Sequence, residues 1–191
     1  AYLKSVSEIS LQEINLSKVP EDKAEIIIMR NNQETTLSYK DYEREETMTK
    51  EGWCEYTYRI HERYLQEEGA YHIGIRSRDE VNNQKNSLSD HQVGLRFVVD
   101  HTAPQGIFLN TKSKENIYQQ KHNIIMKIDD SMGVESIAVY LDNCKIPFAK
   151  KDNLVSFQVN QKNERQNVRV VASDKAGNQS EFLLEHILVT T

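Results

Sequence analysis

Acidic side chains that follow predicted strands are the residues of this chain best placed to do chemistry. Asp129 and Asp130 end one alternating segment, Asp174 ends another, and Asp100 lies where the first half of the chain passes into the second. Calcium takes about six to eight oxygen ligands, which converging carboxylates can supply. These residue types therefore allow a calcium site. The competing interpretation is that they form turns and a solvated acidic rim.

No catalytic constellation is recognisable in the sequence. The histidines are dispersed and lack the spacing of metal ligands on a helix; they are His61, His72, His91, His101, His122 and His186. Only seven glycines are present, and neither a Gly-x-Ser-x-Gly element nor a phosphate-binding loop occurs. We therefore predict that the chain is not an enzyme, and we assign it no catalytic, cofactor-binding or metal-ligating residue.

Aromatic side chains raise the alternative of a carbohydrate platform. Tyr39, Tyr42 and Trp53 gather in one segment, and Tyr56 and Tyr58 share one face of a predicted strand because they are two residues apart. The competing interpretation for the last two is that they line a core or pair across strands.

Composition excludes several other classes of function. The 191 residues carry a net charge of −5 and show no basic stripe, which argues against nucleic-acid binding. No run of about eighteen apolar residues occurs, so we expect no membrane contact within this segment. Residues 1–5 do not resemble a signal peptide; in an excerpt of a longer protein, that signal would lie upstream. Cys54 and Cys144 fall at non-equivalent positions of the two halves, and we expect two free thiols.

A repeated pattern sets the architecture that must position these residues. Residues 73–83 and 168–178 both alternate apolar positions, then reach Asp and, four residues later, Asn; the spacing is 95 (174 − 79). A repeat of this length predicts one small β-domain present twice. The alternation predicts that four side chains face the two cores: Ile73, Ile75, Val168 and Val170. Asn-Asn at 31–32 and Asp-Asn at 142–143 predict tight hairpins.

The repeat extends into the first half of each copy with a different offset. We align Ile14 and Leu16 with Met126 and Ile128, an offset of 112 (126 − 14). The first copy therefore carries an insertion of about sixteen residues, expected in surface loops around 39–53. Within it, residues 38–50 are compatible with one short helix or a charged loop.

The boundary between the copies is a short polar hinge. Residues 100–104 end in Pro104, which suits the entrance of a strand better than its centre. We predict one domain over residues 1–100 and a second over 101–191, joined by a stiff linker.

Three segments in this order resemble bacterial immunoglobulin-like modules, which occur in tandem in large secreted or wall-attached proteins, mostly of Gram-positive bacteria. The segments are 99–104, 129–143 and 172–178. The resemblance implies an all-β fold with two tandem Ig-like antiparallel β-sandwiches. The first domain lacks a clear counterpart of strand 106–109, so it either misses its first strand or uses Tyr2–Val6 instead.

The resemblance also implies a function and a location. It implies a non-catalytic structural or adhesive module pair of a bacterial cell-surface protein, spacing or presenting a binding domain. The alternative is an accessory carbohydrate- or protein-binding module of a secreted glycan-degrading enzyme. The implied partners are neighbouring Ig-like domains of the same chain and a host protein or glycan, without nucleic acid, and the implied location is secreted or cell-surface. In such a sandwich, the calcium interpretation places Asp100, Asp129, Asp130 and Asp174 at the inter-domain joint, facing Glu62, Glu67 and Glu68.

Overall fold

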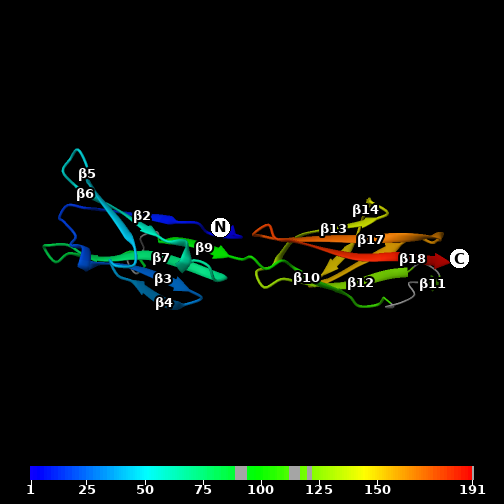
Figure 1. Cartoon of the computed structure of the whole chain (residues 1–191). Helices are drawn as coiled ribbons and strands as arrows, with labels where there is room; N and C mark the ends of the chain where they lie inside the picture. Colours follow the sequence, from blue (N-terminus) through cyan, green and yellow to red (C-terminus); the bar gives the residue numbers. More distant parts are fainter. Residues whose placement is uncertain (89–93, 112–116, 120–121, 191) are drawn as a thin grey trace. The chain divides into compact units, whose positions relative to one another are not determined.

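The chain forms two compact units, residues 1–101 and 102–191, each built from β-strands (Figure 1). The computed structural model describes residues 1–88, 94–111, 117–119 and 122–190. In these ranges the non-strand elements are two 3-10 turns, Glu21–Lys23 and Glu62–Tyr64. No helix long and apolar enough to cross a membrane occurs in the part of the chain that the structure describes.

Unit 1 consists of two sheets packed face to face. The strands are β1 (Tyr2–Leu3), β2 (Ile9–Asn15), β3 (Ala24–Arg30), β4 (Gln33–Leu37), β5 (Glu43–Met48), β6 (Cys54–Ile60), β7 (Gly69–Arg78), β8 (Gln84–Asn86) and β9 (Leu95–Val99). The larger sheet has the order β1-β9-β7-β3-β4, with β8 paired to β7, and the smaller sheet has the order β2-β6-β5. β1 runs parallel to β9, so Tyr2–Leu3 supply the first strand of the larger sheet.

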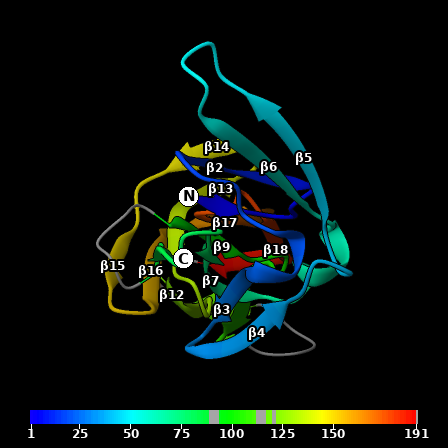
Figure 2. The same ribbon diagram turned by 90° about the vertical axis from the view of Figure 1, so that its left-hand side faces the viewer.

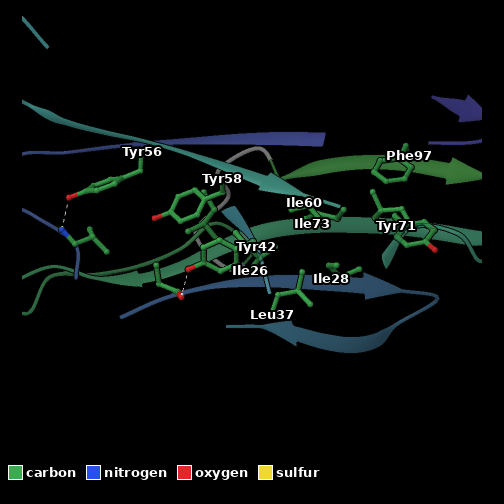
Figure 3. Close-up of a cluster of buried hydrophobic side chains, with 14 of the residues drawn as sticks. Ile26, Ile28, Leu37, Tyr42, Tyr56, Tyr58, Ile60, Tyr71, Ile73 and Phe97 are labelled. Carbon is green, nitrogen blue, oxygen red and sulfur yellow. Dashed lines mark hydrogen bonds between the residues drawn. The ribbon is translucent and has the colours of Figure 1, made fainter. Parts of the chain in front are cut away.

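The core of unit 1 lies between these sheets and is rich in isoleucine and tyrosine (Figure 3). Ile26, Tyr58 and Ile73 are fully buried and come from β3, β6 and β7. Tyr71 stacks on Phe97 with ring centroids 5.1 Å apart. Burying one large apolar side chain stabilises a fold by about 1.5–3 kcal/mol, so these residues hold the two sheets together.

Unit 2 has the same arrangement with one more strand in its smaller sheet. Its strands are β10 (Gln105–Phe108), β11 (Ile117–Gln119), β12 (His122–Asp129), β13 (Val134–Leu141), β14 (Cys144–Ile146), β15 (Ala149–Lys151), β16 (Leu154–Val159), β17 (Lys162–Asp174) and β18 (Gln179–Thr190). The sheet orders are β11-β18-β17-β13-β14 and β10-β12-β16-β15. β12, β16 and β17 therefore correspond to β2, β6 and β7, whereas β10 has no counterpart among the described residues of unit 1.

Several local predictions are confirmed. Ile73, Ile75, Val168 and Val170 all point into the cores, with exposed fractions of 8% or less. The β3–β4 and β13–β14 hairpins turn at 31–32 and 142–143, where both pairs of residues have φ values of 48° and 65°. These left-handed angles are the ones that a two-residue turn matching the strand twist requires.

The prediction of a short helix or a charged loop for residues 38–50 of unit 1 is wrong, because the centre of this segment is a β-strand. Glu43–Met48 form β5, which pairs antiparallel with β6 along its whole length. The additional length extends the β5–β6 hairpin, whose turn reaches beyond the rest of unit 1 (Figures 1 and 2). This strand can contain several glutamates, although glutamate favours helices, because it lies at the edge of the sheet. Charged side chains at an edge also discourage pairing with other chains.

The alignment of β2 with β12 is wrong by one residue. Ile14 and Leu16 are exposed, with exposed fractions of 46% and 72%, while Glu13 and Asn15 are buried. When Tyr56 is aligned with Val155, Glu13, which lies opposite Tyr56 in the β2–β6 ladder, matches Met126, which lies opposite Val155 in the β12–β16 ladder, and the offset becomes 113 (126 − 13). A shift of one residue moves every side chain of a strand to the other face, which is why this error changes the composition of the core.

Candidate functional site

A buried cluster of polar side chains in unit 1 is the group most unlike an ordinary sandwich core. β2 turns its alternate residues inward, beginning with Ile9 and Leu11, and the same phase brings Glu13 and Asn15 against the opposite sheet. Glu13 is only 7% exposed. A buried carboxylate is costly unless donors surround it, so its partners decide what it can do.

Three donors from three strands surround this carboxylate. Asn15 Nδ2 donates to Glu13 Oε1 over 2.8 Å, and the Tyr58 hydroxyl donates to Glu13 Oε2 over 2.8 Å. Ser77 Oγ also donates to Oε1. Because Ser77 lies on β7 while Glu13 and Tyr58 lie on the smaller sheet, the carboxylate ties the two sheets together.

The hydroxyl groups of the neighbouring tyrosines also have hydrogen-bond partners in the core. Burial raises the pKa of Tyr58 above its usual range, and the adjacent Glu13 carboxylate raises it further. Burial raises the pKa of Tyr42 to about 12 despite the nearby Arg44, and its hydroxyl donates to Ala24 O over 2.7 Å. Figure 3 shows Tyr42, Tyr56 and Tyr58 side by side, with the Tyr42 and Tyr56 hydroxyls bonded to backbone atoms.

The chemistry of the cluster is therefore structural. A general base must reach a substrate proton, whereas both oxygens of Glu13 already accept from side chains of the core. The corresponding positions of unit 2 are apolar; Glu13, Asn15, Tyr58 and Ser77 correspond to Met126, Ile128, Phe157 and Ala172. The fold thus does not require the cluster, and the alternation of Ile9 and Leu11 is the sequence signal that could have revealed it.

The repeated Asp and Asn residues form matching turns, as the turn interpretation predicted. Asp79 Oδ1 accepts from Val81 N over 3.0 Å and from Asn83 N over 2.8 Å, and its Oδ2 accepts from Asn83 Nδ2. In unit 2, Asp174 makes the corresponding pair of bonds to Asn178 N and Nδ2. Burial alone would raise the pKa of Asp79, but these hydrogen bonds outweigh it and lower the pKa.

The same turn needs a left-handed residue in both units. Asn82 has a φ of 67° and Gly177, three residues after Asp174, has a φ of 86°. Asparagine tolerates this conformation better than most residues. Unit 1 therefore forms the same turn with Asn82 where unit 2 has Gly177.

Each acidic residue considered for calcium is described within its own unit. Asp130 and Asp174 of unit 2 bring one oxygen each to within 4.8 Å. Asp129 instead pairs with Lys127 Nζ at 2.9 Å and accepts from Asn153 Nδ2; the Lys127 bond and the Asn153 bond lower its pKa. Asp100 is buried at the end of unit 1. These local contacts do not test the calcium site, which stays a prediction.

The glutamates considered for the same site have partners within unit 1. Glu67 forms an ion pair with Arg30, and Glu68 Oε1 accepts from His101 N over 2.9 Å. Glu62 begins a 3-10 turn and accepts from Leu65 N with its backbone carbonyl. These contacts have local structural roles.

The aromatic residues do not form a common platform. Tyr56 and Tyr58 are fully buried and Tyr42 nearly so, which confirms the core interpretation for the first two. Tyr39 and Trp53 are 43% and 41% exposed, but they lie at opposite ends of β5. At about 3.3 Å per residue that strand separates them by roughly 15–20 Å.

Histidine and cysteine add no metal site within the described ranges. No histidine or cysteine there belongs to a group of potential ligands close enough to hold an ion; His91 lies outside the described residues. Burial lowers the pKa of His72 and of His122. Cys54 is buried and Cys144 exposed, and both are free thiols, as predicted.

Comparison with known proteins identifies no family for this chain. No protein-family profile matches the chain, and no curated protein matches its sequence. Among solved structures, the fibronectin(III)-like modules of Clostridium thermocellum CbhA share 12% identity, with 99% of this chain and 89% of that chain covered and a TM-score of 0.42.

Two further solved structures show similarly low identity. The mouse nectin-like molecule 4 ectodomain shares 11% identity, with coverage of 100% and 62% and a TM-score of 0.44. A calcium-stabilised, ice-binding adhesin of an Antarctic bacterium shares 10% identity, with coverage of 98% and 45% and a TM-score of 0.36. At these values no function, ligand or partner transfers to this chain.

Proposed function

We propose that this chain is a non-catalytic structural or adhesive pair of Ig-like modules from a larger bacterial cell-surface protein. Its work is to space or present a binding domain outside the cell, in contact with neighbouring modules of the same chain and with a host protein or glycan. The proposal rests on the observation that the buried carboxylates bond to groups of their own unit. Glu13, Asp79 and Asp174 each accept hydrogen bonds that hold their own unit together.

The repeated architecture supports the same proposal. Each unit closes its own core between two sheets, and the second begins within a few residues of the end of the first. Modules of this kind suit a spacer because each adds length without depending on a distant partner.

Labelling of intact cells tests whether the chain is exposed on the cell surface. An antibody raised against the chain should label unpermeabilised cells of the source organism, and mild protease treatment of those cells should remove the label. Label that requires permeabilisation would refute the surface assignment. A glycan array distinguishes the alternative, an accessory module of a secreted glycan-degrading enzyme, because that role requires saccharide binding by the chain itself.

A further inference from the structure

The solvent-exposed face of the smaller sheet of unit 2 carries several apolar side chains, although polar residues are usual on such a face. One row across its four strands alternates apolar and basic residues; it consists of Ile107, Lys127, Leu154 and Lys151. Leu109 extends the row of apolar residues along β10, since its N–H donates to Ile125 O. Ile107, Leu109 and Leu154 are 61%, 52% and 41% exposed. We call Ile107, Leu109, Leu154, Lys127 and Lys151 the basic apolar face.

An exposed apolar cluster of this kind marks an interaction surface. The solvent-facing side of an antiparallel sheet is ordinarily polar, and unit 2 follows that pattern poorly here. Lys127 Nζ lies 2.9 Å from Asp129 Oδ2, so part of its charge is balanced, and Lys151 adds a second positive charge at the far side of the row.

Unit 1 carries a cluster of the opposite charge on its corresponding sheet. Ile14 lies opposite Glu55 in the β2–β6 ladder, and Glu55 lies opposite Thr47 in the β6–β5 ladder, so these side chains share the outer face. Leu16 and Trp53 are two residues from Ile14 and Glu55, and their exposed fractions are 72% and 41%. Glu45 lies on the same face and pairs with Arg59 at 3.0 Å, so part of its charge is balanced, and Glu55 adds a second carboxylate. We call Ile14, Leu16, Trp53, Glu45 and Glu55 the acidic apolar face.

Charge decides which of these faces can meet. A basic face against a second basic face would bring lysines together, and two acidic faces would bring glutamates together; both arrangements are unfavourable. The whole units have the same bias. Residues 1–101 contain 13 Lys and Arg against 19 Asp and Glu, a net of −6, while residues 102–191 contain 11 against 10, a net of +1.

We propose that the acidic apolar face of one molecule binds the basic apolar face of a second copy of this chain. The contact joins unlike surfaces, so each copy still offers one free face and association continues into rings or filaments. This goes beyond the proposed function, because a spacer needs no contact with its own copies. Each face has three exposed apolar anchors, which suits a weak interface of small area.

Sedimentation of the full chain over a concentration series tests the proposal. Association should rise from micromolar to millimolar protein and weaken between low and high salt, because solvent-exposed charges are screened. Trp53→Asp and Leu154→Asp should each raise the apparent dissociation constant at least about tenfold, since central aromatic and apolar anchors dominate such contacts. The matched controls are Val81→Asp in unit 1 and Leu183→Asp in unit 2, both more exposed than Trp53 and Leu154 and outside the two faces.

Mixing the two variants provides the sharpest readout. Trp53→Asp keeps a working basic apolar face and Leu154→Asp keeps a working acidic one, so their equimolar mixture should form a 1:1 dimer and stop there. Circular dichroism should show that each variant keeps the wild-type fold. A chain that stays monomeric at millimolar concentration would overturn the proposal, as would equal effects of the control variants or a mixture that fails to associate. None of these results would alter the surface location tested above, so the two proposals fail independently.

Discussion

Removing the Tyr58 hydroxyl tests whether the Glu13 cluster holds unit 1 together. Tyr58→Phe deletes the donor to Glu13 Oε2 and leaves the carboxylate with Asn15 and Ser77 alone. Tyr56→Phe is the matched control, because Tyr56 lies two residues away on the same strand, is equally buried and accepts from a neutral donor, the backbone N–H of Val19.

The expected magnitudes follow from the charge of the partner. A hydrogen bond to a charged group contributes about 1.5–3 kcal/mol and a neutral one about 1 kcal/mol, and stranding a buried partner adds to both. We expect Tyr58→Phe to lower the free energy of unfolding by about 2–3 kcal/mol and Tyr56→Phe by about 1–2 kcal/mol. For a unit of this size each kcal/mol lowers the melting temperature by roughly 5 °C.

Trp53 makes the assay specific for unit 1. It is the single tryptophan of the chain and lies in that unit, so its fluorescence during urea unfolding reports unit 1 alone. In a Glu13→Met background, Tyr58→Phe should cost little, giving a coupling energy of at least about 1.5 kcal/mol. Substituting all four positions by the unit 2 residues, Met, Ile, Phe and Ala, should recover or exceed wild-type stability, because well-packed apolar groups often replace buried charge without loss.

Two results would refute this reasoning. One is a Tyr58→Phe cost no larger than that of Tyr56→Phe, which would mean that the charge on Glu13 does not strengthen the bond. The other is additive behaviour of Glu13→Met and Tyr58→Phe, which would mean that the two groups do not act as a unit.

Three further substitutions test other parts of the fold. Asp174→Ala should lower the free energy of unfolding by about 1–3 kcal/mol in thermal unfolding, because it strands the turn donors of Asn178; a change below about 0.5 kcal/mol would contradict the turn's role. Burial lowers the pKa of His122 below its usual value despite its hydrogen bond to the backbone of Asn110. The unfolded chain therefore binds the proton at a higher pH than the folded chain, and the free energy of unfolding falls as the pH drops below about 6.5. His122→Phe should flatten this pH dependence in urea unfolding followed by circular dichroism, and an unchanged pH dependence would exclude His122 as its source. Gly74→Ala should lower the free energy of unfolding by about 1–3 kcal/mol through overpacking, because the added Cβ would lie 2.9 Å from Leu88 Cδ2. An unchanged free energy of unfolding would show that the segment containing Leu88 moves aside.

Strands with one clear apolar phase could be predicted from the sequence. Residues 73–75 and 168–170 alternate without ambiguity, and the structure buries the predicted side chains. The Asp–Asn turns were also predictable, because their hydrogen bonds join residues four apart. Both signals are local, so neighbouring residues suffice to specify them.

β2 could not be placed in this way because it contains two competing apolar phases. Ile9 and Leu11 favour one face, while Ile14 and Leu16 favour the other. The outcome depends on Tyr58 and Ser77, which lie 45 and 64 residues from Glu13 along the chain. A pattern read within one strand contains no information about such distant partners.

The strand β5 could not be predicted from the sequence for a related reason. Its glutamates favour a helix in isolation, yet pairing with β6 overrides that preference because strand propensity depends on neighbours in the sheet. The ladder runs from Glu43–Arg59 to Met48–Cys54, and Arg59 also pairs with Glu45 at 3.0 Å. Cross-strand pairs of opposite charge stabilise an exposed edge that its composition alone would not.

The two units separate what the fold needs from what one unit adds to it. Both keep the left-handed hairpin residues at 31–32 and 142–143 and the Asp-anchored turn with a left-handed residue, Asn82 or Gly177. These features stabilise the chain reversals on which the topology depends. By contrast, the polar core cluster and the charged outer faces differ between units whose central strands are arranged alike. Since the fold is satisfied without them, these positions are free to differ between the units, and both the stability of the cluster and the proposed pairing of the faces can be measured separately on the intact chain.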